Sequence, residues 1–388
     1  MPYDFETTVD RRHTASLKWD KFKDPDVLPF WVADMDFQSA PEIQAALSER
    51  LNHGVFGYTI PSDEVKQSVV KYLARDHGYE IDPAWIIWTP GVVPALNLFC
   101  RAFGEAGSSV MTATPVYPPF LTAPANSGRN LIAVDLIWEN SRWTFDFEKM
   151  EEKITPDTKS FILCNPHNPV GRVFDKEELS QLADFCVRHD LVLCTDEIHS
   201  DLILERGLKH TPTNLISKEI SQRSIMLTSP SKTYNLPGLC CAFAIIENPS
   251  IRAAFRKVAR GIITEINAFG YAGCQAAFDH GGAWRLALLD YLKSNRDYLY
   301  EFVSRELPQI GMRPMEATYL AWMDVSKLGL DNPTAYFESH GVGLSEGTFF
   351  GAPDHVRFNF GCSQSLMIEG LERMKKAVEA LQTSGATG

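Results

Sequence analysis

The sequence lacks the features that define several classes of protein. No run of about 18 apolar residues is present, and a membrane-spanning helix needs one. Basic residues are also few, since 37 lysines and arginines are outnumbered by 49 aspartates and glutamates, which gives a formal charge of −12. Proteins that bind nucleic acids or anionic membranes need a basic face. We therefore expect a protein that binds neither nucleic acid nor a membrane.

The eight cysteines lack the CxxC spacing of zinc and redox sites. Several of them, such as Cys164 and Cys194, lie within apolar runs, as packed and reduced thiols do. We therefore expect no disulfide framework and no metal site, which is typical of a cytosolic protein. Residues 1–10 contain neither a basic start nor an apolar core and so do not resemble a signal peptide. Together these features predict a cytoplasmic location.

Internal repeats and low-complexity segments are absent as well, while 45% of the 388 residues are hydrophobic and 11% are aromatic. Such a composition excludes disorder and provides a core for one large or two smaller domains. In the middle of the chain, short apolar runs alternate with amphipathic helices, a pattern that predicts a mostly parallel α/β sheet. The expected strands are 85–89, 109–112, 131–134, 160–164, 191–195, 224–228 and 242–246.

The pattern changes towards the C-terminus, where a smaller α+β domain is expected. Its expected elements are a long helix over 284–307, strands over 316–325 and 356–360, and a last helix over 365–381.

The N-terminal segment has little periodicity and predicts an arm or loops. Ser39, Pro41 and Glu42 then have the spacing of a helix start, with the serine as the cap. We expect three regions: an N-terminal arm with part of the small domain in 1–44, a large domain in 45–280 and a small domain in 281–388.

Lys232 lies in the segment SPSKTYNLPG (229–238), directly after an expected strand. An isolated lysine of this kind is most often an exposed loop residue. The functional alternative is a lysine that forms a Schiff base with pyridoxal phosphate. That function needs three further groups, namely a carboxylate for the pyridine nitrogen, a donor for the ring hydroxyl and a cradle for the phosphate.

Two other polar segments also follow expected strands, where ligands bind in open α/β sheets. Asn168 lies in NPHNPVG, which on its own predicts only a tight turn. Asp196 opens DEIH, which could be an exposed acidic loop. A carboxylate at a strand end is partly buried, however, and must pair with a cation. A protonated pyridine nitrogen would be that cation and would keep the ring an electron sink.

Asn168, Asp196 and Lys232 are spaced by 28 and 36 residues. Within their motifs, this arrangement resembles the fold-type-I pyridoxal-phosphate enzymes of the class I/II aminotransferase superfamily. The segments ADMDF (33–37), GYT (57–59) and DEIHSDL (196–202) resemble more narrowly the cystathionine β-lyase group called the MalY/PatB family. The resemblance covers nearly the whole chain. It implies an α/β fold-type-I transferase, with a mostly parallel seven-stranded sheet in the large domain and a smaller α+β domain.

The resemblance implies a role for each residue around the cofactor ring. Lys232 would hold the pyridoxal phosphate and then act as the general base, Asp196 would pair with the pyridine nitrogen, and Asn168 would donate to the ring hydroxyl. Tyr117, in TPVYP, corresponds to the aromatic residue that stacks on the ring. His199 stands where many transaminases have a tyrosine. Lys232, Asp196 and Tyr117 are therefore the expected catalytic residues.

The resemblance also implies a cradle for the phosphate. Val92 and Val93, at an expected helix start, would offer backbone N–H groups to it, as helix N-termini do. Ser229 and Ser231 correspond to hydroxyls that reach the phosphate. Tyr58 corresponds to a tyrosine that reaches the phosphate of the neighbouring subunit, so a homodimer is implied.

Arg357, in VRFNF, corresponds to the arginine that binds the substrate α-carboxylate, a task suited to a planar guanidinium. Asn168 and Tyr117 would contact the substrate beside it. The implied reaction is the α,β-elimination of L-cystathionine or related cysteine S-conjugates to pyruvate, ammonia and a thiol. Cys240 stands where many transaminases have a phosphate-binding arginine, which favours the lyase, and an aminotransferase is the alternative. Ala317 and residues 361–364 also differ from the commoner family residues, which leaves the substrate size open.

Two other functions compete with this one. Ser345 lies in GLSEG, which fits the G-x-S-x-G pattern of a serine hydrolase, but TFFGAP follows where that pattern needs a helix. The other is a non-catalytic regulator that keeps the fold as a binding module. The presence of Lys232, Asp196 and Arg357 together argues against it.

Overall fold

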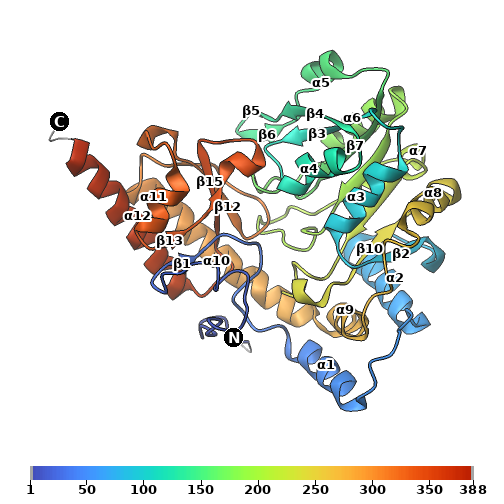
Figure 1. The fold of residues 1–388 in the computed structure, drawn as a ribbon, viewed down its shortest axis with the longest axis horizontal. Coiled ribbons are helices and arrows are strands. Elements are labelled where there is room, and N and C mark those ends of the chain that lie inside the picture. The colour runs from blue at the N-terminus through green and yellow to red at the C-terminus, as the bar shows by residue number, and fades with distance from the viewer. Residues whose placement is uncertain (1–2, 386–388) are drawn as a thin grey trace.

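The computed structural model describes residues 3–385, and its largest sheet has seven strands in the order β2-β10-β9-β8-β7-β3-β4 (Figure 1). β10 runs antiparallel to both of its neighbours, and the other pairs are parallel. The mostly parallel seven-stranded sheet is therefore confirmed, and each strand overlaps an expected one. The strands are β2 (Ile86–Thr89), β3 (Ser109–Thr114), β4 (Asn130–Asp135), β7 (Thr158–Cys164), β8 (Val192–Asp196), β9 (Ser224–Thr228) and β10 (Ala242–Ile245).

Both faces of this sheet are covered by helices, as parallel strands with continuous apolar runs require. Successive side chains of β7 point to opposite faces. Ile162 packs in the core that includes α3 (Val92–Ala102), whereas Phe161 packs in the core that includes α6 (Lys176–Arg188). Since both faces are filled, polar groups gather at the carboxyl ends of the strands.

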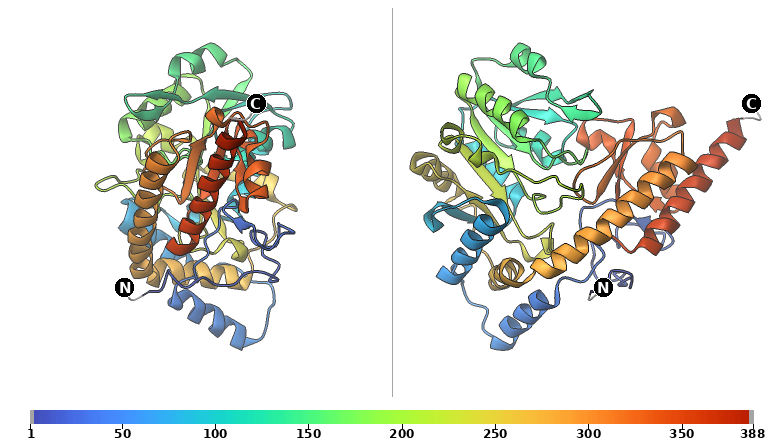
Figure 2. Two further views of the ribbon diagram at one scale, coloured as in Figure 1. Left: turned by 90° about the vertical axis from the view of Figure 1, so that its left-hand side faces the viewer. Right: turned by 180° about the vertical axis from the view of Figure 1, so that it is seen from behind.

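A smaller antiparallel sheet has the strand order β11-β12-β15-β14. Figure 2 shows α10 (Gly282–Glu306) running from the larger part along the smaller one, where it lies beside α12 (Gln364–Gly385). The N-terminal arm joins this part, because β1 (Leu28–Pro29) pairs with β13 (Val342–Gly343). The boundaries at 44 and 280 stay a prediction. The sheet consists of β11 (Gly311–Met312), β12 (Leu320–Asp324), β14 (Ser345–Glu346) and β15 (His355–Asn359).

The helix start expected at Ser39 is wrong in its detail. α1 (Pro41–His53) begins after Ala40, and no side chain caps it. The hydroxyl of Ser39 instead donates to the backbone oxygen of Asn235, 196 residues away. A tertiary contact thus replaces the local one.

The remaining elements include several that the sequence patterns did not predict, among them α8 and α9. No helix within residues 3–385 is long and apolar enough to span a membrane. All eight cysteines are free, and seven of them are buried. The other elements are α2 (Asp63–His77), α4 (Pro118–Asn126), β5 (Ile137–Glu139), β6 (Arg142–Thr144), α5 (Phe147–Lys153), α7 (Lys218–Ser221), α8 (Pro249–Ala259), α9 (Ala268–His280) and α11 (Pro333–Ser339), with short 3₁₀ turns at Pro83–Trp85, Thr213–Leu215, Pro237–Leu239, Ser326–Leu328 and Gly347–Phe350.

Candidate active site

A cavity of about 170 Å³ lies at the carboxyl ends of β7, β8 and β9, next to the first turn of α3. We call it the inner cavity. Alternating strands and helices place these ends together, because parallel strands all finish at the same edge of the sheet. Nine of the expected site residues line it: Val92, Val93, Tyr117, Asn168, Asp196, His199, Ser229, Ser231 and Lys232.

Lys232 is half-buried in the loop after β9, and its side chain lines the inner cavity. Its Nζ donates to the backbone oxygen of Ala33 at 2.5 Å. Burial, and after it the positive charge of Arg357, lowers the pKa of Lys232 to about 8, while Asp34 and Asp196 oppose the shift. A lysine of this kind is easily converted to the neutral amine that a base must be.

The two serines of this loop differ in their free hydrogen-bonding groups. Ser229 donates its hydroxyl proton to the Cys241 carbonyl at 2.7 Å and accepts from the Ser231 N–H at 3.0 Å. The Ser231 hydroxyl has no hydrogen bond within the described residues. Ser231 is therefore the serine with a free donor for a ligand, and Ser229 holds the loop in shape.

Asp196 ends β8 and is buried. Its carboxylate accepts from the Ile198 N–H at 3.1 Å and forms no ion pair with another described residue. Burial raises its pKa to about 7, with a smaller contribution from Glu197, while the Ile198 N–H and Lys232 oppose the shift. A buried carboxylate with so little compensation needs a cationic partner, and the cavity beside it has room for one.

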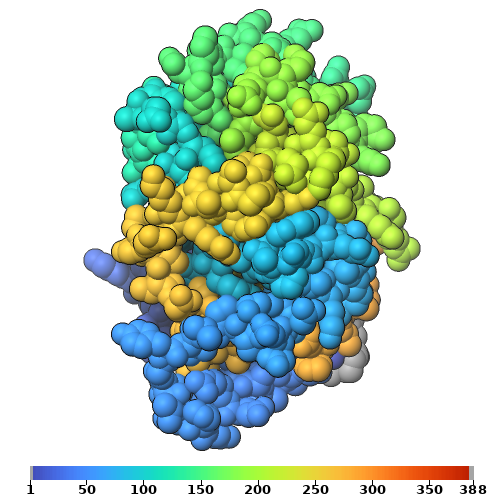
Figure 3. Space-filling view, turned by 90° about the vertical axis from the view of Figure 1, so that its right-hand side faces the viewer, coloured from blue at the N-terminus to red at the C-terminus, as the bar shows by residue number. Residues whose placement is uncertain are grey.

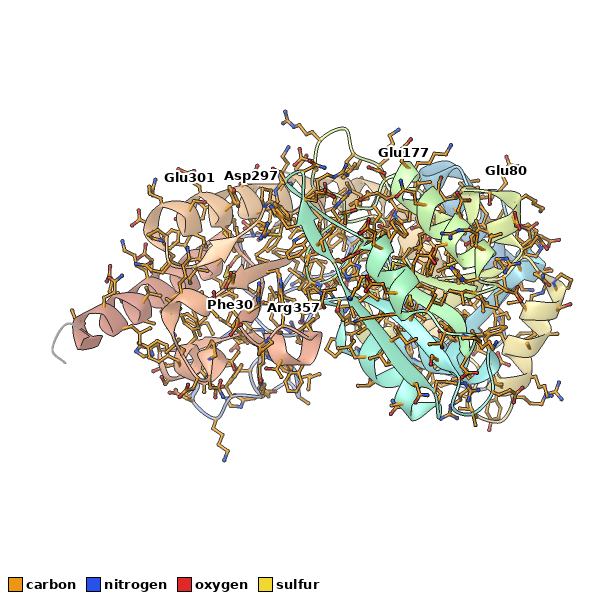
Figure 4. All side chains as sticks on the ribbon, turned by 90° about the horizontal axis from the view of Figure 1, so that it is seen from above. Phe30, Glu80, Glu177, Asp297, Glu301 and Arg357 are labelled. Carbon is orange, nitrogen blue, oxygen red and sulfur yellow. The ribbon has the colours of Figure 1, made fainter. Side chains whose placement is uncertain are left out.

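Arg357 lies on β15 and does not line the inner cavity. It is hydrogen-bonded to Asn168, which does line that cavity. One guanidinium nitrogen donates to Asn168 Oδ1 at 3.1 Å, and another donates to the Trp31 carbonyl at 2.9 Å. Its Nε has no partner among the described residues. Burial lowers the pKa of Arg357 to about 10, against the influence of Tyr117 and Tyr319. Figure 4 shows Arg357 where the smaller part meets the larger one.

His199 and Tyr117 also line the inner cavity, where the pyridine ring of the cofactor is expected. Burial lowers the pKa of His199 to about 3, with Lys232 and Arg357 adding to the shift, so its imidazole is neutral. His199 Nδ1 is buried and has no hydrogen-bond partner in the described chain. Tyr117 is fixed by its backbone, since its N–H donates to the Asn168 carbonyl at 3.0 Å.

The first turn of α3 supplies the cradle for an anion. Val92 and Val93 are its first two residues, and N–H groups in a first turn have no partner within their helix. The helix dipole makes this end attractive to a phosphate. Cys240 also lines the cavity.

A segment that includes the motif ADMDF (33–37) runs beside the inner cavity, which its Ala33 lines. We call residues 31–37 the strap. Ala33 accepts from both Lys232 and the Tyr319 hydroxyl, the latter at 3.0 Å. Asn359 donates to the carbonyls of Val32 and Asp34 at 2.6 and 2.7 Å. The strap is thus attached to the small sheet and to the lysine loop at once.

Asn235 attaches the other end of the strap. Its amide accepts from the Met35 N–H at 2.9 Å and donates to the Met35 and Phe37 carbonyls, each at 2.8 Å. Asn235, Asn359 and Tyr319 were missed as site residues. The available signal was that the first two lie inside the motifs SPSKTYNLPG and VRFNF.

The N-terminal arm fixes the strap with buried charges. Lys18 is fully buried and lies 2.7 Å from the Asp36 carboxylate, which also accepts from Arg11 at 2.7 Å and from the Trp19 indole at 2.8 Å. Arg11 also pairs with Asp34 at 2.8 Å. Removing one partner of such a buried pair costs about 3–5 kcal/mol, so the arm is required for the geometry of the strap.

Ser345 does not form a hydrolase nucleophile. Its hydroxyl donates to the Trp31 carbonyl at 2.8 Å and accepts from Arg357 at 3.3 Å. The two-residue strand β14 holds it, and a 3₁₀ turn at Gly347–Phe350 follows instead of a helix. The serine therefore positions the strap and the arginine.

Tyr58 lies apart from the inner cavity, in the loop between α1 and α2. It is fully exposed and borders a different hollow, which Phe56 and residues 263–269 also line. Within this chain it contributes nothing to the inner cavity. Its expected role depends on a second subunit.

The polar groups of the inner cavity that lack partners match the polar groups of pyridoxal phosphate. Within residues 3–385, Asp196 has no cationic partner and His199 Nδ1 has no hydrogen-bond partner, and the N–H groups of Val92 and Val93 lie at a helix start. Pyridoxal phosphate offers a protonated ring nitrogen, a ring hydroxyl and a phosphate to these three places. Lys232 lies in the same wall as the amine that would hold its aldehyde.

The comparisons with known proteins extend over nearly the whole chain. A family model described as aminotransferase class I and II matches residues 25–374. Cystathionine beta-lyase PatB of Bacillus subtilis is 38% identical over 385 residues, which are 96% of this chain and 99% of that protein. The crystal structure of OvoB matches with a TM-score of 0.95 at 43% identity and covers 97% of this chain and 99% of its own. Cystalysin from Treponema denticola, whose structure contains pyridoxal 5′-phosphate, matches with a TM-score of 0.94 at 34% identity, over 98% of this chain and 100% of its own.

Proposed function

Because the chain belongs to the class I and II aminotransferase family, we propose that it is a pyridoxal-phosphate-dependent carbon–sulfur β-lyase. It cleaves L-cystathionine or a related cysteine S-conjugate by α,β-elimination and releases pyruvate, ammonia and a thiol. The observation that carries this proposal is one site with a lysine amine, a buried carboxylate that forms no ion pair with any described residue, and a buried arginine. These residues are Lys232, Asp196 and Arg357.

Pyridoxal phosphate, when bound, supplies an electron sink for the electron pair left at the substrate α-carbon. Asp196 keeps that sink effective, because its carboxylate stabilises a proton on the ring nitrogen. Asn168 offers its amide nitrogen to the ring hydroxyl, since its oxygen is already engaged by Arg357. Val92, Val93 and Ser231 would hold the phosphate, and these site assignments are part of the proposal.

Arg357 binds the α-carboxylate of the substrate with its guanidinium, which is a strong contact in a buried place. The substrate amine is then directed towards Lys232, which lines the inner cavity together with Asn168. The Lys232 amine, once free, takes the α-proton onto Nζ. The bond between the β-carbon and sulfur then breaks, and the electron pair leaves with the thiolate. Tyr117 and the strap enclose the reacting atoms, which keeps water away from them.

Elimination is favoured over transamination by the substrate and by the site. A thiolate is a good leaving group at the β-carbon, so its loss competes with return of the proton to another carbon. The similarity to a named cystathionine beta-lyase at 38% identity agrees with this choice. Cys240, where many transaminases have an arginine, agrees with it as well. An aminotransferase is the second candidate.

We also propose a homodimer with shared active sites. Exposed apolar side chains flank Tyr58 in its loop, namely Val55, Phe56 and Ile60, and water is an unfavourable neighbour for such a group. Figure 3 shows a face of the molecule on which the blue segment that contains the first helices lies beside the yellow segment that contains α8. In a closed dimer Tyr58 would reach the phosphate of the partner. The eight free thiols further support a location in a reducing compartment such as the cytoplasm.

A product assay tests the proposed function. With L-cystathionine or S-methyl-L-cysteine, the holoenzyme should release pyruvate, ammonia and a free thiol in equal amounts, without any added keto acid. An aminotransferase would instead need an amino acceptor and would give a keto acid that retains the thioether. That second outcome would replace the lyase with the alternative.

A further inference from the structure

A second cavity, of about 540 Å³, adjoins the inner one. We call it the outer cavity. Tyr117 lines both cavities, and Arg357 lines only the outer one. Its walls come from the N-terminal arm, from the start of α4 and from the small domain, which contribute Trp31, Pro118 and Phe349 among others. Three parts of the chain far apart in the sequence therefore shape one hollow beside the substrate-binding arginine.

The outer cavity lies where the sulfur substituent of a substrate must go. Arg357 holds the α-carboxylate and Lys232 faces the amine, and the inner cavity is occupied by the cofactor. What extends beyond the β-carbon can therefore enter only the hollow that begins at Arg357 and Tyr117. We propose, building on the proposed lyase function, that the preferred substrates are cysteine conjugates with a bulky aromatic S-substituent that is neutral or cationic.

The size of the outer cavity supports a bulky substituent. A hollow of about 540 Å³ is in the range of sites for drug-sized ligands. A methyl substituent would leave nearly all of the outer cavity filled with water, and it would bury little apolar area against the walls. Burial of apolar area is the main source of affinity here, so a larger substituent gains more.

The walls of the outer cavity favour an aromatic group. The rings of Trp31, Tyr117, Phe349 and Phe350 line it, together with neighbouring prolines. Phe350 is fixed by the ring of Trp322, with centroids 5.4 Å apart. Phe349 is 63% exposed, which is unusual for a phenylalanine without a ligand or partner. A planar substituent could stack against these faces and cover Phe349.

The charges in the walls disfavour an anionic substituent. Glu338 and Glu346 line the outer cavity, and neither forms an ion pair with any residue in the described range. Lys21 is the only cation in the wall besides Arg357, and its ammonium lies over the rings of Trp31 and Phe22, at 4.2 and 4.9 Å. Once the substrate carboxylate neutralises Arg357, two carboxylates face one ammonium. A second carboxylate on the substrate would find no arginine to bind it.

A matched series of conjugates tests this inference with the holoenzyme. S-methyl-, S-benzyl-, S-(4-aminomethyl)benzyl- and S-(4-carboxy)benzyl-L-cysteine all release alkyl thiolates, so their leaving groups are comparable. We expect kcat/KM for thiol release to be at least about tenfold higher for S-benzyl than for S-methyl, as one extra buried group allows. The aminomethyl compound should exceed the carboxy compound by about fivefold or more, as a charge contact at a partly exposed site allows. Equal values for methyl and benzyl, or a preference for the carboxy compound, would overturn the inference.

Variants of the outer cavity separate binding there from general damage. Phe349→Ala should lower the benzyl-to-methyl ratio of kcat/KM by about tenfold, and Glu346→Gln should abolish the preference for the aminomethyl compound. Leu286→Ala, an equally exposed apolar residue on α10, should leave both ratios unchanged. If either variant behaves like this control, the outer cavity does not bind the substituent. If no conjugate releases a thiol, the lyase function fails, and dissociation constants from titration of the cofactor absorbance then decide the inference alone.

Discussion

The amine of Lys232 donates to the carbonyl of Ala33 at 2.5 Å, although 199 residues separate the two. This contact links the loop that carries the reactive lysine to the strap. The same carbonyl also accepts from Tyr319. An amine that donates one N–H to a fixed carbonyl has a restricted direction for its lone pair. The contact therefore orients Lys232 whenever its amine is free, which is the moment when it must act as a base.

Lys232→Ala should abolish both turnover and the absorbance of covalently held cofactor, because no other amine of the described residues lines the inner cavity. Borohydride reduction of the wild-type protein followed by peptide mapping should place the pyridoxyl group on residue 232. Lys209→Ala, which changes an exposed lysine, is the matched control and should keep both properties. Labelling of a different lysine would remove the basis of the site assignment.

Tyr319→Phe should lower kcat while changing the overall fold little, because only one hydroxyl is lost from a buried ring. The hydrogen bond to Ala33 contributes about 1 kcal/mol, so kcat should fall by roughly three- to tenfold. The pH profile of kcat should also shift, since the carbonyl that faces the lysine amine becomes free to move. A variant with an unchanged profile and a lower melting temperature would indicate a purely structural role.

Asp196→Asn should change the pH dependence of stability of the protein after cofactor removal. In the folded protein the pKa of Asp196 is raised to about 7, above its ordinary value of 3.8. The folded state therefore holds the proton more tightly, and its stabilisation, present below pH 4, is lost as the pH rises towards 7. Denaturant unfolding of wild type should show this decline, on the order of a few kcal/mol, and the asparagine variant should lack it. Equal slopes for both proteins would contradict the buried, uncompensated state of this carboxyl group.

With the cofactor bound, the same variant should behave differently. Asparagine cannot supply the negative charge that keeps the ring nitrogen protonated, so kcat should fall strongly while the cofactor stays bound. Comparison of cofactor absorbance with turnover separates these two effects.

How much of this site is readable from the sequence depends on what each residue contacts. The strands were predictable because β7, β8 and β9 contain short apolar runs between turn residues. Asp196 ends β8, and Asn168 and Lys232 lie in the loops that follow β7 and β9. These side chains line the inner cavity at the strand ends, so residue type and position suffice to suggest them.

The residues that hold the strap could not be predicted in the same way. Asn359 and Tyr319 bond to backbone carbonyls, and a carbonyl has no signature in the sequence. Lys18 lies in the segment that the sequence predicts only as an arm or loops, and its partner Asp36 is close to it only in the folded chain. Ser39 likewise gives up a local cap for a contact with Asn235. Long-range polar contacts override local rules at each of these places.

Arg357→Lys should lower kcat/KM by about 10- to 100-fold, mainly through KM, because lysine keeps the charge but loses the planar fork that binds a carboxylate. Arg357→Ala should lower it further, since a hydrogen bond to a charged group contributes roughly 1.5–3 kcal/mol. Steady-state kinetics on S-benzyl-L-cysteine measure both. If alanine raises KM no more than lysine does, the carboxylate is bound elsewhere.

Tyr58 should act across a dimer interface, because it is fully exposed in one chain and does not line that chain's inner cavity. Tyr58→Phe should weaken cofactor binding, since the phosphate loses one hydroxyl donor. A mixture of Tyr58→Phe and Lys232→Ala subunits, allowed to exchange, should form heterodimers in which one site has both native residues. Such a mixture should exceed the summed activity of the two separate variants, and sedimentation should give the mass of a dimer. A fully active monomer, or a mixture no more active than its components, would show that Tyr58 serves no partner subunit and that the exposed apolar group around it has another cause.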